Sequence, residues 1–455
     1  MQRRDDPRGA AAESGATQPG ATQPGATEPP LTKPTLTDAA ARAGGPGTIA
    51  PAAASEPPPN WVLTLWTMVG IQVVMSIAFT ILAPIVPLFL PDLGVRRPDM
   101  VDLWAGILAS VTSLVGTFAA PVWGRLADRY GRKLMVLRSS IGIAVFTGLM
   151  GIAQTVWHML AFRMAMGLFA GFNSAAIALV ASQVPDQRLG YALGWLSTGQ
   201  LVGALIGPVV GGVLADVTDS YRAPFFFAAA LSVVAFLLAW WLVPERFVAP
   251  PPSGGRHSRS IPAAMALFRA TPGLAALMLV LLLAQFAVQA VQPVVTLFVQ
   301  SLTGPVPQVA TLAGVAFSVT GLADVIASPF LGKRSDVLGY RRVLIISLFG
   351  AAAATLPQAF AHSYWTFVAE RFGVGCFVGG ILPTANALVG RMVSASSRGF
   401  VYGLSSSASF LGIALGPLTG GVVAASAGLR WVFVVTALLL AVNLVWVRFA
   451  VPADS

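Results

Sequence analysis

Long apolar runs, separated by short polar segments, dominate the chain from residue 61 to residue 450. A helix needs about 20 apolar residues to cross the ~30 Å hydrocarbon core of a bilayer. The runs are continuous rather than alternating, which favours helices over the strands of a membrane barrel. We predict twelve spans, at residues 61–90, 104–123, 134–155, 158–181, 191–214, 223–243, 272–300, 309–331, 343–361, 364–389, 400–424 and 431–450.

The composition supports a membrane protein. Hydrophobic residues make up 56% of the 455 residues and charged residues only 10%, whereas a soluble domain carries about 25% charged residues. Such a chain cannot cover a water-facing surface. The net charge of +10 would suggest a nucleic-acid partner in a soluble protein, but here its distribution among the loops matters more.

The basic residues lie mainly in one set of loops. The loops after even-numbered spans contain fifteen Lys and Arg residues, and the opposite loops contain four. Positive residues remain on the cytoplasmic side of a membrane, so we expect both termini to be cytoplasmic. The excess of Lys and Arg therefore indicates how the chain is oriented in the membrane, and we expect no nucleic-acid partner.

The predicted organisation has five parts. Residues 1–60 are rich in Ala, Pro, Gly and Thr, a composition that favours a disordered cytoplasmic tail. Residues 61–243 and 272–450 form two six-helix bundles. Residues 244–271, which contain Pro250–Gly255, form a flexible cytoplasmic linker, and residues 451–455 form a short tail.

The second half of the chain repeats features of the first. A shift of 208 residues places Gly332 on Gly124 and Asp336 on Asp128, and a shift of 209 places Gly416–Pro417 on Gly207–Pro208. This spacing predicts duplicated, pseudo-symmetric bundles. Parallel repeats of this kind are typical of transporters that bind their substrate between the bundles and alternate access to it.

The segment after span 2, from Gly124 to Lys133, contains a carboxylate, Asp128, among basic residues. Glycine permits close helix approach and tight reversals, and a carboxylate there can join a charge network or meet a helix N-terminus. The alternative, a solvated basic turn, is weakened by the repeat after span 8. We predict a conformational latch formed by Gly124, Asp128, Arg129, Gly131, Arg132 and Asp336.

Span 5 carries glycines at every fourth position, which form one smooth face for close helix packing. A proline in this stripe is expected to kink the helix. Ordinary small-residue packing would explain one such stripe, but the same spacing recurs in span 11. The residues of this motif are Gly194, Gly203, Gly207, Pro208, Gly211 and Gly212, with Gly416 and Pro417 in span 11.

With these two motifs the chain resembles the major facilitator superfamily, in its twelve-helix drug:proton antiporter (DHA1-type) branch. Leu137–Ser139, the pattern around Arg163 and Gly167, and Leu196–Gly199 are most similar to MdtG-type bacterial multidrug exporters. The resemblance covers residues 61–450 and implies the fold of that family, proton-driven export of amphipathic compounds and a bacterial inner membrane. It also implies that Asp128 latches one conformation and that Arg163 serves proton coupling.

Four of the ionisable residues inside the predicted spans are candidates for a function, because burial of a charge in lipid is costly. Asp324 lies near mid-bilayer in span 8, Glu370 and Arg371 lie early in span 10, and Arg163 lies at the equivalent depth of span 4. We predict that Asp324, Glu370 or both carry the proton, with Arg163 or Arg371 as counter-ion. Structural ion pairs are the alternative.

Polar amides mark a candidate substrate site. In span 7, Gln285, Gln289 and Gln292 share one helix face. They are expected to line the cleft together with Gln72 and Asn173. Interhelical hydrogen bonds are the competing interpretation.

The sequence therefore predicts a secondary transporter. It contains no phosphate-binding loop of the P-loop type and no ligand-like spacing of histidines, so we expect neither enzymatic activity nor a cofactor or metal. The leading function is multidrug efflux by antiport, with amphipathic small molecules, protons and the lipid bilayer as partners of a monomer in the plasma membrane. A carrier of one specific metabolite, or a transport-inactive sensor, are the alternatives.

Overall fold

A computed structural model describes residues 61–245, 271, 273–393 and 398–451. The predicted disordered tail, most of the predicted linker and nearly all of the C-terminal tail lie outside these residues. All regular structure in the described part of the chain is helical. Twelve helical stretches are long and apolar enough to cross a membrane, which confirms the all-helical, twelve-span fold predicted from the apolar runs.

The helices divide evenly between the first and second halves of the chain. The first half contains α2 (Trp61–Thr80), α3 (Ile85–Phe89), α4 (Pro98–Tyr130), α5 (Arg132–Gly151), α6 (Val156–Phe169), α7 (Phe172–Gln183), α8 (Leu189–Thr218) and α9 (Ala223–Leu242). The second half contains α11 (Leu274–Ala290), α12 (Gln292–Thr303), α13 (Val309–Leu338), α14 (Tyr340–Thr355), α15 (Tyr364–Val378), α16 (Ile381–Met392), α17 (Arg398–Ala427) and α18 (Leu429–Ala450).

Four spans are interrupted, and the interruptions recur at the same place in each half. Spans 1 and 7 break between α2 and α3 and between α11 and α12, and spans 4 and 10 break between α6 and α7 and between α15 and α16. Gly171, with φ of 109°, occupies the break in span 4, and Gly379–Gly380 occupies that in span 10. In transporters, discontinuous helices of this kind surround binding sites, because their freed backbone groups can face a cavity.

Several helices extend beyond the apolar runs that predict them. The segment from Gly124 to Lys133, expected as a loop, is almost wholly helical, because α4 continues to Tyr130. Only Gly131, with φ of 96°, separates α4 from α5. Gly339 separates α13 from α14 in the same way, with φ of 92°. Polar residues at the membrane surface can remain helical, so the apolar run in the sequence ends before the helix does.

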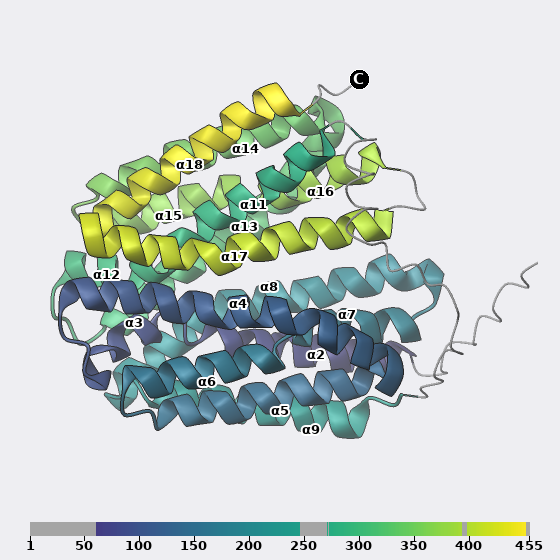
Figure 1. Cartoon of the computed structure of the whole chain (residues 1–455), viewed down its shortest axis with the longest axis horizontal. Helices are drawn as coiled ribbons and strands as arrows, with labels where there is room; N and C mark the ends of the chain where they lie inside the picture. Colours follow the sequence, from purple (N-terminus) through teal and green to yellow (C-terminus); the bar gives the residue numbers. More distant parts are fainter. Residues whose placement is uncertain (1–60, 246–270, 272, 394–397, 452–455) are drawn as a thin grey trace, which may run out of the picture. The chain divides into compact units, whose positions relative to one another are not determined.

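The two halves lie side by side, with the long helices of both running in the same general direction (Figure 1). Between them, α4 packs against α17 and α8 packs against α13; within the halves, α2 packs on α8 and α11 on α17. We call the end formed by the loops after even-numbered spans the basic end, which lies on the right of Figure 1, and the other the opposite end. Residues 65–243 supply most of one buried apolar cluster, and residues 274–451 supply two others.

A pair of equivalent contacts supports the internal repeat. Lys133 Nζ donates to the Trp240 carbonyl at 2.8 Å. In the second half, the Arg341 guanidinium donates to the Arg448 carbonyl, and both residues lie 208 positions after their counterparts. The third and sixth spans of each half are therefore joined at the basic end by the same kind of bond.

Candidate functional site

The candidate site is a cavity between the halves, with two adjoining lobes. The first lobe has a volume of about 270 Å³ and the second about 480 Å³. Thr80, Ala83, Gln289 and Gln292 line both lobes, so the two lobes meet where the breaks in spans 1 and 7 face each other. Three of the four residues predicted from intramembrane charge line one or other of the lobes.

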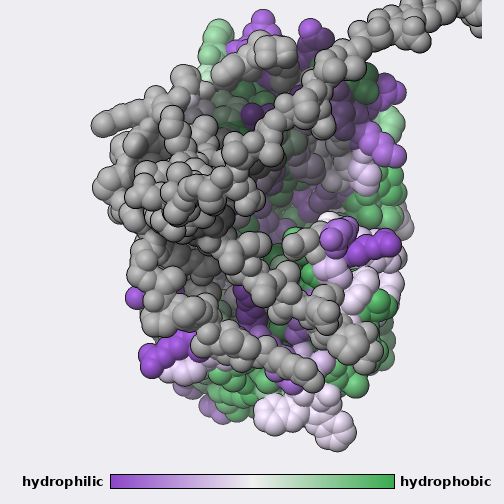
Figure 2. All heavy atoms as spheres, turned by 90° about the vertical axis from the view of Figure 1, so that its right-hand side faces the viewer, coloured by the Kyte–Doolittle hydropathy of each residue, from purple (hydrophilic) through white to green (hydrophobic). Residues whose placement is uncertain are grey.

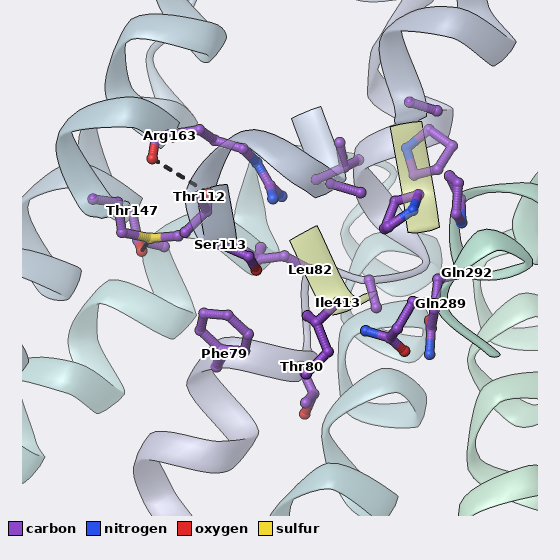
Figure 3. Close-up of a pocket in the computed structure, with 18 of the residues that line it drawn as sticks. Phe79, Thr80, Leu82, Thr112, Ser113, Thr147, Arg163, Gln289, Gln292 and Ile413 are labelled. Carbon is purple, nitrogen blue, oxygen red and sulfur yellow. Dashed lines mark hydrogen bonds between the residues drawn. The ribbon is translucent and has the colours of Figure 1, made fainter. Parts of the chain in front are cut away.

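Arg163 belongs to the first lobe (Figure 3). One of its guanidinium nitrogens donates to the Leu108 carbonyl at 3.1 Å, and its backbone carbonyl accepts from Thr112 Oγ1 at 3.3 Å. Its Nε atom is buried without a hydrogen-bond partner among the described residues. Figure 3 shows Arg163 on one side of the lobe, with Gln289 and Gln292 on the other. The lobe thus has a cation on one wall and amides on the facing wall.

Asp324 and Arg371 belong to the second lobe. Arg371 is only 7% exposed, and its Nε atom has no partner among the described residues. The side-chain oxygens of Gln358 and Thr436, on the same lobe, are also buried and unpaired within the described part of the chain. Buried polar groups without partners are costly, so this wall presents polar atoms that remain available to a solute or a proton.

Glu370 lies apart from Asp324. It is not among the residues that line either lobe, although its Oε2 atom is buried and unpaired in the described structure. Neighbouring residues of a helix point about 100° apart, so the burial of Arg371 in the lobe turns Glu370 away. The structure thus places Asp324 and Arg371 on the wall of the same lobe and Glu370 outside both lobes.

The predicted amides divide into two groups. Gln285, Gln289 and Gln292 all line the second lobe, as their shared helix face suggests. Gln72 is instead buried, and its Nε2 atom donates to Asn173 Oδ1 at 3.3 Å. Neither residue of this pair lines a lobe, so an interhelical hydrogen bond, the competing interpretation, describes their geometry.

The glycine stripe of α8 closes the first half against α2. A β-carbon on Gly203 would overlap Ser76, one on Gly207 would overlap Thr80, and one on Gly211 would overlap Ile81. The helix runs through Pro208 without a break. The equivalent stripe closes the second half against α11 through Gly412, Gly416 and Gly420.

The next glycine of each stripe closes the halves against each other. A β-carbon on Gly212 would lie 2.6 Å from Thr311 Cα of α13, and one on Gly421 would lie 2.8 Å from Gly106 Cα of α4. Both contacts lie toward the opposite end of the spans. Pro417, beside Gly416, places its carbonyl against Gly106.

The same four inter-half helices separate toward the basic end. Gly124 of α4, Gly194 of α8, Gly332 of α13 and Gly403 of α17 have no neighbour within 4 Å of the position of a β-carbon. Figure 2, which views the basic end, shows hydrophilic residues gathered on this face among apolar ones. The expectation that Gly124 marks a close helix approach is wrong for this conformation, because the helices diverge at that point.

Among the side chains that the structure describes, the predicted latch residues do not form one network in this conformation. The Arg129 guanidinium lies 5.3 Å from the ring centroid of Tyr130, and Asp336 accepts a hydrogen bond from the Tyr340 hydroxyl. The Asp128 side chain lies outside the described part of the structure. Among the described contacts, none joins the two halves through these residues.

Glu245 has the helix-terminal role that was expected of Asp128. Its two carboxylate oxygens accept from the backbone N–H groups of Arg132 and Lys133 at 2.8 and 2.9 Å. These groups open α5, where a helix leaves N–H groups unpaired. The sequence signal was available: Glu245 directly follows the end of span 6, among cations of the basic end.

Arg138, the central residue of the Leu137–Ser139 pattern, contacts the break in span 4. Its guanidinium donates to the carbonyls of Phe169 and Ala170 at 3.4 and 3.0 Å, where span 4 breaks. It lies 3.6 Å from the ring centroid of Trp123, whose Nε1 donates to the Leu168 carbonyl at 2.6 Å. Arg138 therefore satisfies backbone groups that the break leaves unpaired. The equivalent position of the second half, 208 residues later, is Ile346. An isoleucine side chain cannot donate hydrogen bonds to the carbonyls at the break in span 10.

The side chains of the cavity can bind a solute. Among the described residues, no three His, Cys, Asp or Glu side chains gather in a way that could hold a metal ion. The cavity instead combines apolar walls with one carboxylate, two guanidinium groups and several amides. Such an arrangement suits an amphipathic solute, since few directed polar groups lie among adaptable apolar surfaces.

Comparisons with known proteins agree with this architecture. The model of the Major Facilitator Superfamily matches residues 68–312 and 277–455. The multidrug resistance protein MdtG of Enterobacter lignolyticus is 36% identical over 393 residues, covering 86% of this chain and 93% of that protein. MdtG of Proteus mirabilis is 36% identical over 376 residues, covering 82% and 92%.

Solved structures show the same fold at lower identity. A bacterial homologue of the human lysosomal transporter Spinster, in an inward-facing, unoccupied conformation, has a TM-score of 0.69 at 18% identity, covering 86% of this chain and 97% of that one. The human organic anion transporter MFSD10 has a TM-score of 0.63 at 19% identity, covering 86% and 100%. With twelve spans, a repeated half and these relatives, the chain belongs to the major facilitator superfamily.

Proposed function

We propose that the protein is a proton-coupled secondary transporter that exports amphipathic drugs or toxic compounds by alternating access. Its relatives are named multidrug resistance proteins. Its twelve spans, together with these bacterial relatives, support a multi-pass protein of a bacterial inner membrane. The observation that carries the proposal is the cavity between two related halves, closed by glycine contacts at the opposite end and divergent at the basic end.

The orientation follows from the loop charges. The basic end carries the Lys and Arg residues of the even-numbered loops, and positive loops remain cytoplasmic. The described conformation is then inward-open, and the halves must rock apart at the opposite end to release a solute outside. The predicted latch around Gly124, Asp128 and Asp336 would close the basic end in the outward-open state. In that state its glycines would pack against a helix of the other half.

Proton coupling is assigned to the second lobe. Asp324 is a carboxylate on the wall of the cavity, in the same lobe as the buried Arg371. A carboxyl between apolar walls and a cation changes its proton affinity when the surroundings change, which is the property that antiport requires. Arg163 is the matching cation of the first lobe. Glu370 could act as a second proton carrier only in another conformation, in which its carboxylate reaches the cavity.

Transport in proteoliposomes tests the proposal. Purified protein in vesicles with an imposed pH gradient should move several chemically unrelated amphipathic dyes, and Asp324→Asn should abolish the pH-driven flux. Asp219→Asn is the matched control, because Asp219 is exposed and lies outside the cavity; its left-handed φ of 48° also suits asparagine. Unchanged pH-driven flux in Asp324→Asn would contradict the coupling assignment.

The same assay separates the alternatives. Broad competition among unrelated compounds supports multidrug export, whereas a response to one compound supports a specific metabolite carrier on the same fold. Absence of flux for every compound, in either gradient direction, would support a transport-inactive sensor. The family consists of transporters, so we expect no enzymatic turnover. We also expect that the monomer is the functional unit.

A further inference from the structure

A carboxylate of the first half contacts the start of a helix in the second half. Asp216 lies near the C-terminal end of α8, and its Oδ2 atom accepts from the Thr311 backbone N–H at 2.7 Å. Thr311 is the third residue of α13. The first N–H groups of a helix have no partner within the helix, and their partial positive charge favours an anion. The contact is therefore a charge-assisted hydrogen bond between the halves.

The surrounding contacts place this bond at the closed end of the cavity. Gly212, one turn before Asp216, packs on the backbone of Ala310 and Thr311. About two turns before Gly212 on α8, the Leu205 carbonyl accepts from Ser318 Oγ at 2.5 Å. The polar bonds and the glycine contact lie along one seam between α8 and α13. If these helices part at this end, the Asp216 bond must break.

The bond is present in only one of the two pseudo-equivalent interfaces. The position 209 residues after Asp216 is Ala425, at the end of α17. The α4–α17 interface therefore lacks the corresponding carboxylate, although it retains the glycine contact of Gly421 on Gly106. The asymmetry means that the repeat alone does not require an acidic residue at position 216. A specific role in the α8–α13 seam accounts for it.

We propose that Asp216 is a positioning residue that holds the opposite end closed and must release the α13 N-terminus before that end can open. This inference rests on the proposed alternating-access function and adds to it a latch on the side away from the Gly124–Asp336 motif. Because the bond exists only while the halves touch there, it stabilises the described conformation and does not stabilise the state open at the opposite end.

Distance measurements by pulsed electron paramagnetic resonance test the latch directly. In a Cys376→Ser background, spin labels at Ile152 and Phe360, two exposed residues that are 208 positions apart, report the opposite end. Labels at Tyr130 and Leu338, related in the same way, report the basic end. Removal of the latch should lengthen the first distance and shorten the second.

Three variants and one control are compared with the wild type. Asp216→Ala removes the acceptor and should raise the ratio of opposite-end-open to closed molecules about tenfold. Asp216→Asn keeps an oxygen acceptor but loses the charge, so its ratio should be intermediate. Ser318→Ala removes the second polar bond of the seam and should shift the ratio in the same direction. Asp219→Asn, three residues from Asp216, should match the wild type.

A second readout detects small open populations. A cysteine introduced at Ala83, which lines both lobes, is alkylated by a membrane-impermeant maleimide added to the opposite side of oriented vesicles. The rate should rise about tenfold in Asp216→Ala, in proportion to the open population. Circular dichroism and gel filtration test whether each variant is folded. If Asp216→Ala does not fold, Asp216→Asn is used in its place to test the latch.

The outcomes separate the latch from the transport function. Distances and alkylation rates that are equal in Asp216→Ala, Asp216→Asn and the wild type would overturn the latch, even if the wild type exports dyes. A shifted equilibrium in these variants supports it, even if the wild type moves no dye, in which case the proposed function fails separately. Equal shifts in Asp216→Asn and Asp219→Asn would also overturn it, because a general surface-charge effect would then suffice.

Discussion

Asp324 lies directly against Gly379, so that a β-carbon on Gly379 would come within 2.6 Å of Asp324 Oδ1. Gly379 lies in the break between α15 and α16, and Asp324 lines the second lobe. Gly379→Ala must therefore displace either the carboxylate or the break. We expect pH-driven dye transport in proteoliposomes to fall on the order of tenfold or more, because small displacements of a reacting group have large effects.

The matched control for that substitution lies one and a half turns earlier on α15. A β-carbon on Gly373 would lie 3.6 Å from Ala354 Cβ, an ordinary van der Waals distance. Gly373→Ala should retain transport, and its helix should gain up to about 1 kcal/mol of propensity. Equal losses in Gly373→Ala and Gly379→Ala would show that the contact with Asp324 is not the cause.

Gly212→Ala should destabilise the closed opposite end. The added β-carbon would overlap the backbone of Ala310 and Thr311, which cannot be relieved by turning a side chain. We expect the Ile152–Phe360 label distance to lengthen as the halves separate there. Gly194→Ala, on the same helix but with no neighbour within 4 Å, is the control. If both variants leave the distance unchanged, the prediction fails, because the contact between α8 and α13 then accommodates the added β-carbon without separating the halves.

Glu245→Ala should destabilise the basic end of the first half. The substitution leaves the N–H groups of Arg132 and Lys133 without their carboxylate, and loss of a helix cap costs about 0.5–2 kcal/mol. Thermal unfolding in detergent measures the effect on the whole protein. Glu245→Gln, which keeps an acceptor oxygen, should lose less. The interpretation fails if Gln and Ala lower the melting temperature equally.

Arg138→Met should loosen the break in span 4. The variant keeps a long side chain but cannot donate to the Phe169 and Ala170 carbonyls or stack as a cation on Trp123. We expect faster hydrogen exchange in residues 169–175 and a loss of about 1 kcal/mol of stability, since two partly buried carbonyls lose their partners. Arg138→Lys should rescue part of the protection through one retained donor. Unchanged exchange in Arg138→Met would contradict this role.

The sequence determined the architecture, for a physical reason that acts locally. Hydrocarbon offers no hydrogen bonds, so each span must be an apolar helix of sufficient length, and the twelve runs and their duplication are visible without any tertiary information. The shared face of Gln285, Gln289 and Gln292 follows from helix periodicity alone. The ends of the helices did not follow, because α4 and α13 continue as polar helix beyond the apolar run.

Only the tertiary structure decided which partner each helix face meets. Periodicity identifies a glycine stripe on α8, but the rotation of the helix between two neighbours assigns Gly211 to α2 and Gly212 to α13. The same limitation applies to Gln72, whose partner is 101 residues away, and to Glu245, which binds a helix start more than 110 residues earlier. Such contacts depend on how helices pack and on which end of the cavity is closed, and neither is encoded in local spacing.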